Sequence, residues 1–572
     1  MNYREEYERW LAEPLVSQAE KEELRAIANN EKELALRFSK GLTFGTAGLR
    51  GVMKTGWNAM NVHTVAHATQ GLANLILAER RANNGVAIAY DCRVNSPLFA
   101  ETAACVLAAN GIRVYLFDSL RPTPELSFAL RELGCVAGIN ITASHNPKQY
   151  NGYKAYWEDG AQLPPDHAAT VLSEIEKLDI FRDVKRIDLE TAKASGLVTV
   201  IGAEIDEKYL AAVQAQAVNP SAIAAVADDL KIVYTPLHGT GHRLVPEILR
   251  RVGLKHLFTV PEQMAINGNF PTVEKPNPEY PEVFELGIAL ANREGSDLII
   301  ATDPDADRVG VMTRTKNGSF RTVTGNQMGA LLLDYIITAY RKTGTMPPEP
   351  YAVKSIVSTE LATRVCEANG VRMYNVLTGF KFIGEVIKKH EEEGHGSFLF
   401  GFEESYGYLK GTYARDKDAV VTSMLIVEMT AYYHAMGMTL SDALEKLFER
   451  YGFCYETNAE IYMEGLDGAE RMAALMSGLR EKPPVEFAGV RVTCVGDYLR
   501  DTVTENGTVR PTGLPRSNVL SYRLENGDIL VARPSGTEPK IKFYYLLRGK
   551  NEAEARQKAD AYKTALNRIA NI

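Results

Sequence analysis

The chain contains 572 residues, of which 45% are hydrophobic and 24% charged, and its formal net charge at pH 7 is −8. This composition is typical of a globular protein, and the length predicts roughly three to five domains. The excess of acidic residues disfavours a nucleic-acid partner. No run of residues reaches the roughly 18 apolar positions that a membrane span needs, so we expect no membrane association. The six cysteines form no C-x-x-C pair and the N-terminal residues have no apolar signal core, which favours a location in the reducing cytoplasm.

Helical patterns dominate the first 82 residues. Ser17 followed by Glu20 is a capping-box signature, and apolar residues recur after it. A second helix is predicted over residues 62–82, where apolar side chains recur on one side. We assign no chemistry to either helix.

A strand–helix–glycine–strand unit then occurs three times, over residues 87–116, 232–258 and 352–374. Gly111, Gly253 and Gly370 each stand where a helix would end, and the flanking strands suit parallel pairing in βαβ units. The pattern predicts three similar α/β domains, although it is common enough in α/β proteins to recur by chance. The last part of the chain has shorter strands and a helix that opens at Asn551, which predicts a smaller α+β domain. We expect the boundaries at residues 1–205, 206–318, 319–450 and 451–572.

A polar loop, Thr142-Ala143-Ser144-His145-Asn146-Pro147, follows an apolar run at 135–141 that is typical of a buried strand. Pro147 prevents the sheet from continuing, so the hydroxyl of Ser144 is expected at an exposed loop tip. Ser144 is a candidate phosphate carrier, and the alternative is an ordinary turn serine. His145 is adjacent in sequence, which does not by itself establish catalytic geometry.

Asp303, Asp305 and Asp307 alternate directly after the apolar run 298–301, and Arg308 follows them. In extended backbone such residues share one side, where three carboxylates repel one another unless a cation lies between them. Ligands that are all oxygen suit Mg²⁺. A solvated acidic loop is the alternative, but the position after a buried strand favours a site.

Two more polar loops follow. The segment Phe402-Glu403-Glu404-Ser405-Tyr406-Gly407 offers carboxylates and a hydroxyl that suit a sugar. The segment Arg533-Pro534-Ser535-Gly536-Thr537 offers a cation, hydroxyls and flexible backbone that suit a phosphate. Taken alone, the second segment favours a plain Pro/Gly turn.

The four loops, in this order and across nearly the whole chain, resemble those of the α-D-phosphohexomutase family. The resemblance implies an α/β fold of three similar domains with mixed sheets and a smaller C-terminal α+β domain, arranged around a central active-site cleft. The family motifs have glycine where this chain has Pro304, Ala306 and Phe402, and Tyr406 precedes Gly407, so loop shape and sugar selectivity are expected to differ.

The resemblance also implies roles for individual residues. The implied catalytic residues are Ser144, Arg50, His145, Lys154 and Lys381; the implied metal ligands are Ser144, Asp303, Asp305 and Asp307; and the implied substrate-binding residues are Thr46, Arg308, Thr378, Gly379, Glu403, Ser405, Arg533, Ser535, Gly536 and Thr537.

The activity that the resemblance implies is a phosphosugar mutase that uses Mg²⁺, a phosphorylated Ser144 and glucose 1,6-bisphosphate as intermediate. Small-molecule sugar phosphates are the expected partners. We favour interconversion of glucose 1-phosphate and glucose 6-phosphate, with pentose or mannose phosphates as alternatives within the same chemistry. A sugar phosphatase and a non-catalytic sugar-phosphate-binding protein are the alternatives from other classes. There is no G-x-x-x-x-G-K-[ST] motif, which disfavours a P-loop kinase. His390 and His395 flank a glutamate run, but a spacing of five does not place them on one helix face.

Overall fold

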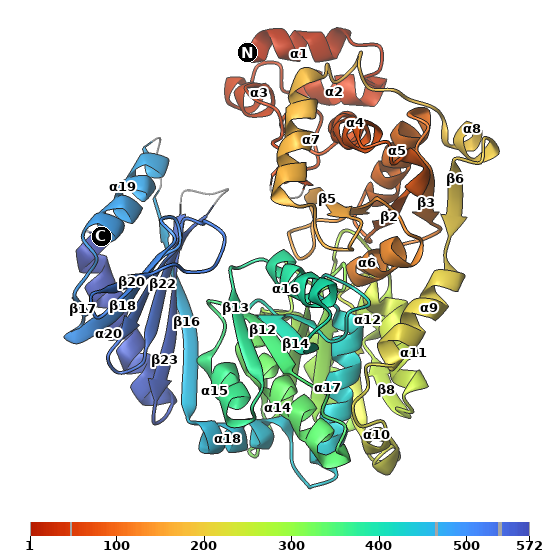
Figure 1. Ribbon diagram of the computed structural model, residues 1–572. Coiled ribbons are helices and arrows are strands. Elements are labelled where there is room, and N and C mark those ends of the chain that lie inside the picture. Colours follow the sequence, from red (N-terminus) through yellow and green to blue (C-terminus); the bar gives the residue numbers. More distant parts are fainter. Residues whose placement is uncertain (1, 46–47, 464–466, 536–539, 571–572) are drawn as a thin grey trace. The chain divides into compact units, whose positions relative to one another are not determined.

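The computed structural model describes residues 2–45, 48–463, 467–535 and 540–570. The chain divides into two compact units. Unit 1 contains residues 1–322 and 406–437, and unit 2 contains residues 323–405 and 438–572 (Figure 1). Among the described residues, no helix combines the length and the apolar character needed to cross a bilayer.

The first sheet of unit 1 has six strands. Their order is β1 (Gly48–Val52), β5 (Tyr150–Trp157), β4 (Ala137–Ile141), β2 (Val86–Tyr90), β3 (Val114–Phe117) and β6 (Val198–Ile201). Strands β4, β2, β3 and β6 run parallel, and β5 and β1 are antiparallel to their neighbours. The helices that precede, connect and follow these strands are α1 (Tyr3–Ala12), α2 (Gln18–Ala26), α3 (Glu31–Phe38), α4 (Val62–Ala78), η1 (Ala82–Asn84), α5 (Ser96–Ala109), α6 (Thr123–Glu132), α7 (Pro165–Lys177) and α8 (Leu189–Ala194).

The second sheet of unit 1 places β9 beside the first strand of the second repeat. Its order is β11 (Phe320–Val323), β10 (Val309–Arg314), β9 (Leu298–Thr302), β7 (Lys231–Thr235) and β8 (His256–Thr259). Strand β7 is parallel to β8 and β9, whereas β10 is antiparallel to β9. The remaining elements of this unit are α9 (Ala203–Gln214), α10 (Ser221–Ala225), α11 (Gly241–Arg251), α12 (Pro261–Met264), η2 (Pro281–Phe284), α13 (Glu285–Glu294), β15 (Gly407–Leu409) and α17 (Ala419–His434).

Unit 2 holds the third repeat and the C-terminal domain. In the repeat, β12 (Pro350–Ser355) pairs in parallel with both β13 (Arg372–Val376) and β14 (Ser397–Glu403). The C-terminal sheet is antiparallel in the order β16 (Phe453–Tyr462), β23 (Lys540–Gly549), β22 (Ile529–Pro534), β21 (Leu520–Leu524), β18 (Val490–Asp497), β19 (Thr502–Glu505) and β20 (Thr508–Arg510), with β17 (Glu486–Phe487) beside β18. The helices of this unit are α14 (Gly325–Thr343), α15 (Glu360–Ala368), α16 (Phe380–Glu393), α18 (Leu440–Tyr451), α19 (Gly468–Glu481) and α20 (Glu552–Ala570).

The three predicted units are β2–α5–β3, β7–α11–β8 and β12–α15–β13. Gly111, Gly253 and Gly370 have φ of +73°, +91° and +64°, so each occupies the left-handed conformation that ends a helix without a Cβ penalty. The mixed α/β sheets confirm the expected fold class, and the C-terminal domain is built on an antiparallel sheet. The four domain boundaries remain a prediction.

Candidate active site

Ser144 lies in the loop that joins β4 to β5. Its backbone N–H donates to Oγ1 of Thr142 over 2.8 Å, and its φ of +52° places it in the left-handed region. The prediction that this hydroxyl is exposed is wrong, because Ser144 is only 3% exposed. The loop after β9 covers it, and the Ser144 hydroxyl donates to Oδ2 of Asp303 over 2.7 Å.

Arg93, which follows β2, fixes the shape of this loop. Its guanidinium donates to the backbone carbonyls of Ser144 and Asn146 over 2.5 Å each, and to those of Pro147 and Tyr150 over 3.0 Å each. The side chain is fully buried, so each of these charge-assisted hydrogen bonds is shielded from water. Arg93 was not predicted from the sequence. Its position just after an apolar run could have indicated it, because polar residues at the carboxyl end of a buried parallel strand often belong to a site.

The three aspartates are buried side by side. One oxygen from each lies within 4.8 Å of the others, in the turn between β9 and β10. Oδ1 of Asp303 accepts the backbone N–H groups of Asp307 and Arg308, over 3.1 and 3.0 Å. Ala306, within the turn, has a φ of +50°, which explains why a glycine is the unstrained residue there. Burial raises the pKa of Asp303 well above its usual range, and the carboxylates of Asp305 and Asp307 raise it further.

Two lysines partly neutralise this carboxylate cluster. Lys154 Nζ lies 2.7 Å from Oδ2 of Asp305 and 3.4 Å from Oδ2 of Asp307. Lys417 Nζ lies 3.0 Å from Asp307 Oδ2 and 3.0 Å from Asp416. Burial works against the charged form of Lys154, but the two aspartates raise its pKa above the ordinary value. Lys417 was not predicted, because nothing in the sequence links the segment before α17 to the aspartate loop.

The carboxylate cluster fits a divalent cation. Asp305 and Asp307 accept their side-chain hydrogen bonds through Oδ2, whereas Oδ1 of each is buried without a hydrogen-bond partner among the residues that the structure describes, and Asp307 Oδ1 lies 3.9 Å from Arg308 Nε. Buried carboxylate oxygens are normally satisfied, and unsatisfied ones that converge are what a hard cation requires. Asp303, Asp305 and Asp307 are therefore suited to hold Mg²⁺.

Three more predicted residues belong to this part of unit 1. His145 Nδ1 lies 3.2 Å from Ser144 Oγ, and burial together with nearby arginines holds the pKa of His145 well below its usual value. Arg50 lies on β1, which pairs with the strand that carries Lys154. Arg308 Nη1 lies 2.8 Å from Glu279. Thr46 falls outside the described residues.

Four of the predicted substrate-binding residues, Thr378, Gly379, Glu403 and Ser405, lie in unit 2. Glu403, at the end of β14, accepts the backbone N–H of Gly379 over 2.7 Å. Gly379 joins Thr378 to the start of α16, where burial lowers the pKa of Lys381. Ser405 follows two residues after Glu403 and is partly exposed. The loops after β13 and β14 therefore present their polar groups at one edge of the sheet.

The predicted phosphate-binding segment lies at the end of β22. Arg533 pairs with Lys542 across β22 and β23, and the N–H of Ser535 donates to the carbonyl of Lys540 over 2.8 Å. Gly536 and Thr537 lie outside the described residues. Within unit 2, these pairings with β23 fix the positions of Arg533 and Ser535 at the end of β22.

Comparison with known proteins gives consistent matches. Residues 41–180, 207–318 and 324–451 match, in turn, the alpha/beta/alpha domains I, II and III described for phosphoglucomutase/phosphomannomutase. A phosphoglucomutase from Staphylococcus aureus is 38% identical over 92% of this chain and 93% of its own length.

Two solved structures share the fold. One is the Paramecium exocytosis-sensitive phosphoprotein parafusin, a phosphoglucomutase in an open form, with a TM-score of 0.69, 18% identity and coverage of 93% of this chain and 95% of that one. The other is Aspergillus fumigatus N-acetylphosphoglucosamine mutase in complex with GlcNAc-6P and magnesium, with a TM-score of 0.51, 14% identity and coverage of 97% and 100%. These two structures support the fold, and the domain matches together with the staphylococcal relative confirm the family resemblance found in the four loops.

Proposed function

The chain belongs to the phosphoglucomutase/phosphomannomutase family. We propose that it interconverts glucose 1-phosphate and glucose 6-phosphate as a phosphoglucomutase. It is a phosphohexomutase, an intramolecular phosphotransferase of the isomerase class. One observation carries the proposed mechanism: the hydroxyl of Ser144 lies 2.7 Å from Asp303 in a cluster of three buried aspartates. The 38% identity to the staphylococcal phosphoglucomutase supports the choice of glucose.

Ser144 is the proposed phosphoryl carrier. Phosphorylated Ser144 gives its phosphoryl group to the free hydroxyl of a glucose monophosphate, so the bond from phosphorus to Oγ breaks and a bond to the sugar oxygen forms. The product is glucose 1,6-bisphosphate, which reorients and returns its other phosphoryl group to Ser144. The sugar hydroxyl loses a proton in the first transfer. His145, whose Nδ1 lies 3.2 Å from Ser144 Oγ, is suited to pass this proton on to the departing Ser144 oxygen, whereas charged Lys154 is suited to stabilise negative charge.

The proposed metal is Mg²⁺, held by Asp303, Asp305 and Asp307 together with Ser144. When bound, it would offset negative charge on the transferring phosphoryl group. Magnesium in the related Aspergillus fumigatus mutase and the two unsatisfied Oδ1 atoms support this assignment.

The remaining predicted residues are proposed to bind the substrate. Arg50 and Arg308 would contact phosphate in unit 1, since a guanidinium matches phosphate oxygens in a bidentate geometry. In unit 2, the sugar hydroxyls would meet Glu403, Ser405 and the Thr378–Lys381 turn, and the non-reacting phosphate would meet the Arg533–Thr537 segment. The six cysteines are free, which supports the proposed cytoplasmic location.

The proposal is tested by supplying the purified protein with Mg²⁺, a trace of glucose 1,6-bisphosphate, and glucose, mannose or ribose 1-phosphate in separate assays. A kcat/KM that is highest for glucose 1-phosphate is the expected result. A preference for ribose 1-phosphate would keep the chemistry and overturn the substrate. Steady release of inorganic phosphate, or no turnover of any substrate, would overturn the mutase assignment in favour of a phosphatase or a binding protein.

A further inference from the structure

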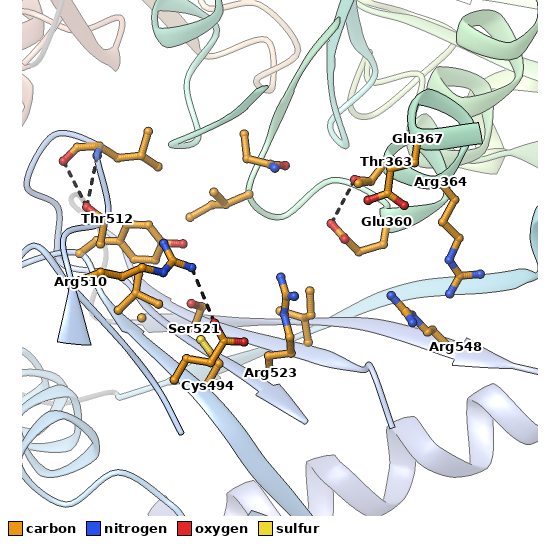
Figure 2. A pocket seen from close by; sticks show the side chains of 18 residues that line it. Glu360, Thr363, Arg364, Glu367, Cys494, Arg510, Thr512, Ser521, Arg523 and Arg548 are labelled. Carbon is orange, nitrogen blue, oxygen red and sulfur yellow. Dashed lines mark hydrogen bonds and ion pairs between the residues drawn. The ribbon is translucent and has the colours of Figure 1, made fainter. Parts of the chain in front are cut away.

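A polar cavity that is partly open to solvent is formed by residues of unit 2, and none of them is a predicted site residue. It has a volume of about 390 Å³ and is formed between α15 and the sheet strands β18, β21, β22 and β23 (Figure 2). Ile529 lines it at the start of β22, whereas Arg533 stands four residues further along the strand, which is about 13 Å at the usual rise per residue. The volume suits a small molecule, and no residue proposed for the mutase reaction lines the cavity.

Arginine is the dominant charged residue in this cavity. Arg364 comes from α15, Arg523 from β21 and Arg548 from β23, and all three side chains line the cavity (Figure 2). Arg523 and Arg548 form no side-chain ion pair with any residue in the described part of the chain.

The acidic residues of the cavity offset only part of this charge. Glu360 Oε1 lies 2.9 Å from the buried Nζ of Lys354. Burial works against the charged form of Glu360, but Lys354, Arg523 and Arg548 hold its pKa below the usual value. Glu505 faces a further arginine, Arg510, at 4.0 Å. Four arginines and three glutamates line the cavity, so its lining carries a formal charge of +1.

The guanidinium groups of Arg364 and Arg548 each pack closely against the backbone of a glycine. The Arg364 side chain donates from Nη1 to the carbonyl of Tyr451 over 2.8 Å, and a Cβ at Gly452 would lie only 2.7 Å from that nitrogen. A Cβ at Gly527 would likewise lie 2.6 Å from Nη1 of Arg548. Both glycines have positive φ, at +86° and +83°, so the backbone turns there create the room that the guanidinium groups occupy.

We propose that this cavity binds a small phosphorylated metabolite at a site separate from the catalytic one. Guanidinium groups bind phosphate through paired N–H donors, and three of them can engage a ligand that carries two or more negative charges. A volume of about 390 Å³ favours a small molecule over a protein or nucleic-acid partner.

The test is isothermal titration calorimetry of the full-length protein with pyrophosphate and, separately, with citrate, without added metal. The experiments use an Arg533→Gln background, so that the candidate phosphate segment at the end of β22 is weakened. We expect pyrophosphate to bind this protein, and the further substitutions Arg523→Gln and Arg548→Gln to weaken binding at least tenfold. Arg491→Gln is the matched control, because Arg491 lies on the same sheet, pairs with Glu525 and does not line the cavity.

Three outcomes would overturn the proposal. They are no pyrophosphate binding in the Arg533→Gln protein, binding that survives the loss of Arg523 and Arg548, and an equal loss in the Arg491→Gln control. Citrate binding as tight as pyrophosphate binding would overturn the assignment to a phosphorylated ligand. Since these titrations measure equilibrium binding alone, their result does not depend on whether the protein turns over glucose phosphates.

Discussion

The hydroxyl of Ser144 donates a hydrogen bond to Oδ2 of Asp303 over 2.7 Å, although 159 residues separate the two in the chain. Each residue follows a buried parallel strand: Ser144 comes after β4 and Asp303 after β9. The contact joins the candidate phosphate carrier to the candidate metal ligands. Substitutions on either side of it are therefore expected to impair the same phosphoryl transfer.

Asp305→Asn is predicted to weaken both metal binding and turnover. The substitution removes one negative charge from the buried aspartate cluster. It also removes the carboxylate that forms the ion pair with Lys154. We expect kcat to fall by about 100-fold and half-maximal activation to require more Mg²⁺. Steady-state assays across a Mg²⁺ titration measure both. Asp297→Asn, an exposed aspartate paired with Arg314 in the same unit, serves as the control. An unchanged Mg²⁺ requirement in Asp305→Asn would remove the metal role from this aspartate.

Arg93→Lys is predicted to lower kcat while the fold is retained. Lysine keeps the positive charge but cannot reach four backbone carbonyls in the way that the guanidinium does. A displaced Ser144 loop should reduce kcat by roughly 10- to 100-fold, with a smaller change in KM. Arg81→Lys, which alters an ion pair with Glu158 in the same unit, should have little effect. A wild-type kcat in Arg93→Lys would show that the carbonyl contacts do not position Ser144.

Glu125→Gln is predicted to change how stability depends on pH. Glu125 is fully buried, 3.8 Å from Arg121, and neither carboxylate oxygen has a hydrogen-bond partner in the described part of the chain. Burial raises the pKa of Glu125 from 4.5 to about 8, although Arg121 lowers it in part. The folded protein therefore holds a proton that the unfolded chain releases, so this group's contribution to stability falls as pH rises from 4.5 towards 8.

Glutamine removes that dependence. The stability of Glu125→Gln relative to wild type should rise with pH by at most about 1.4 kcal/mol per unit over this window. Urea unfolding at pH 5.5, 6.5 and 7.5 measures the difference, with Glu132→Gln, an exposed residue paired with Lys208, as the control. A difference that is constant across these three pH values would show that Glu125 is ionised in the folded protein.

Local sequence patterns were sufficient for the fold class and for the loops that hold the predicted groups. Apolar runs predicted the strands, and glycines at helix ends predicted the turns. Strands and turns could be predicted because each depends on residues that are close together in the chain. The aspartate spacing likewise indicated a cluster, and the structure places the three carboxylates together. Such features follow from periodicity and from backbone conformation.

Contacts between distant segments could not be predicted in this way. Lys417 meets Asp307 across 110 positions of sequence, and nothing near either residue indicates the other. The burial of Ser144 was missed for the same reason, since the covering loop belongs to a different sheet. His390 and His395 share no helix face, yet their Nδ1 atoms lie 3.3 Å apart. Helix α16 ends at Glu393, and Gly394, with a φ of +68°, reverses the chain and brings the two rings together.

The central claim is that Ser144 carries the phosphoryl group. The most direct measurement is to incubate the protein with Mg²⁺ and radiolabelled glucose 1,6-bisphosphate, and then to locate the label by peptide mass spectrometry. We predict that the label is found on Ser144, is removed by added glucose 6-phosphate, and is absent from Ser144→Ala but not from Ser195→Ala. A protein that turns over glucose phosphates without labelling Ser144, or a Ser144→Ala variant with full activity, would contradict the claim.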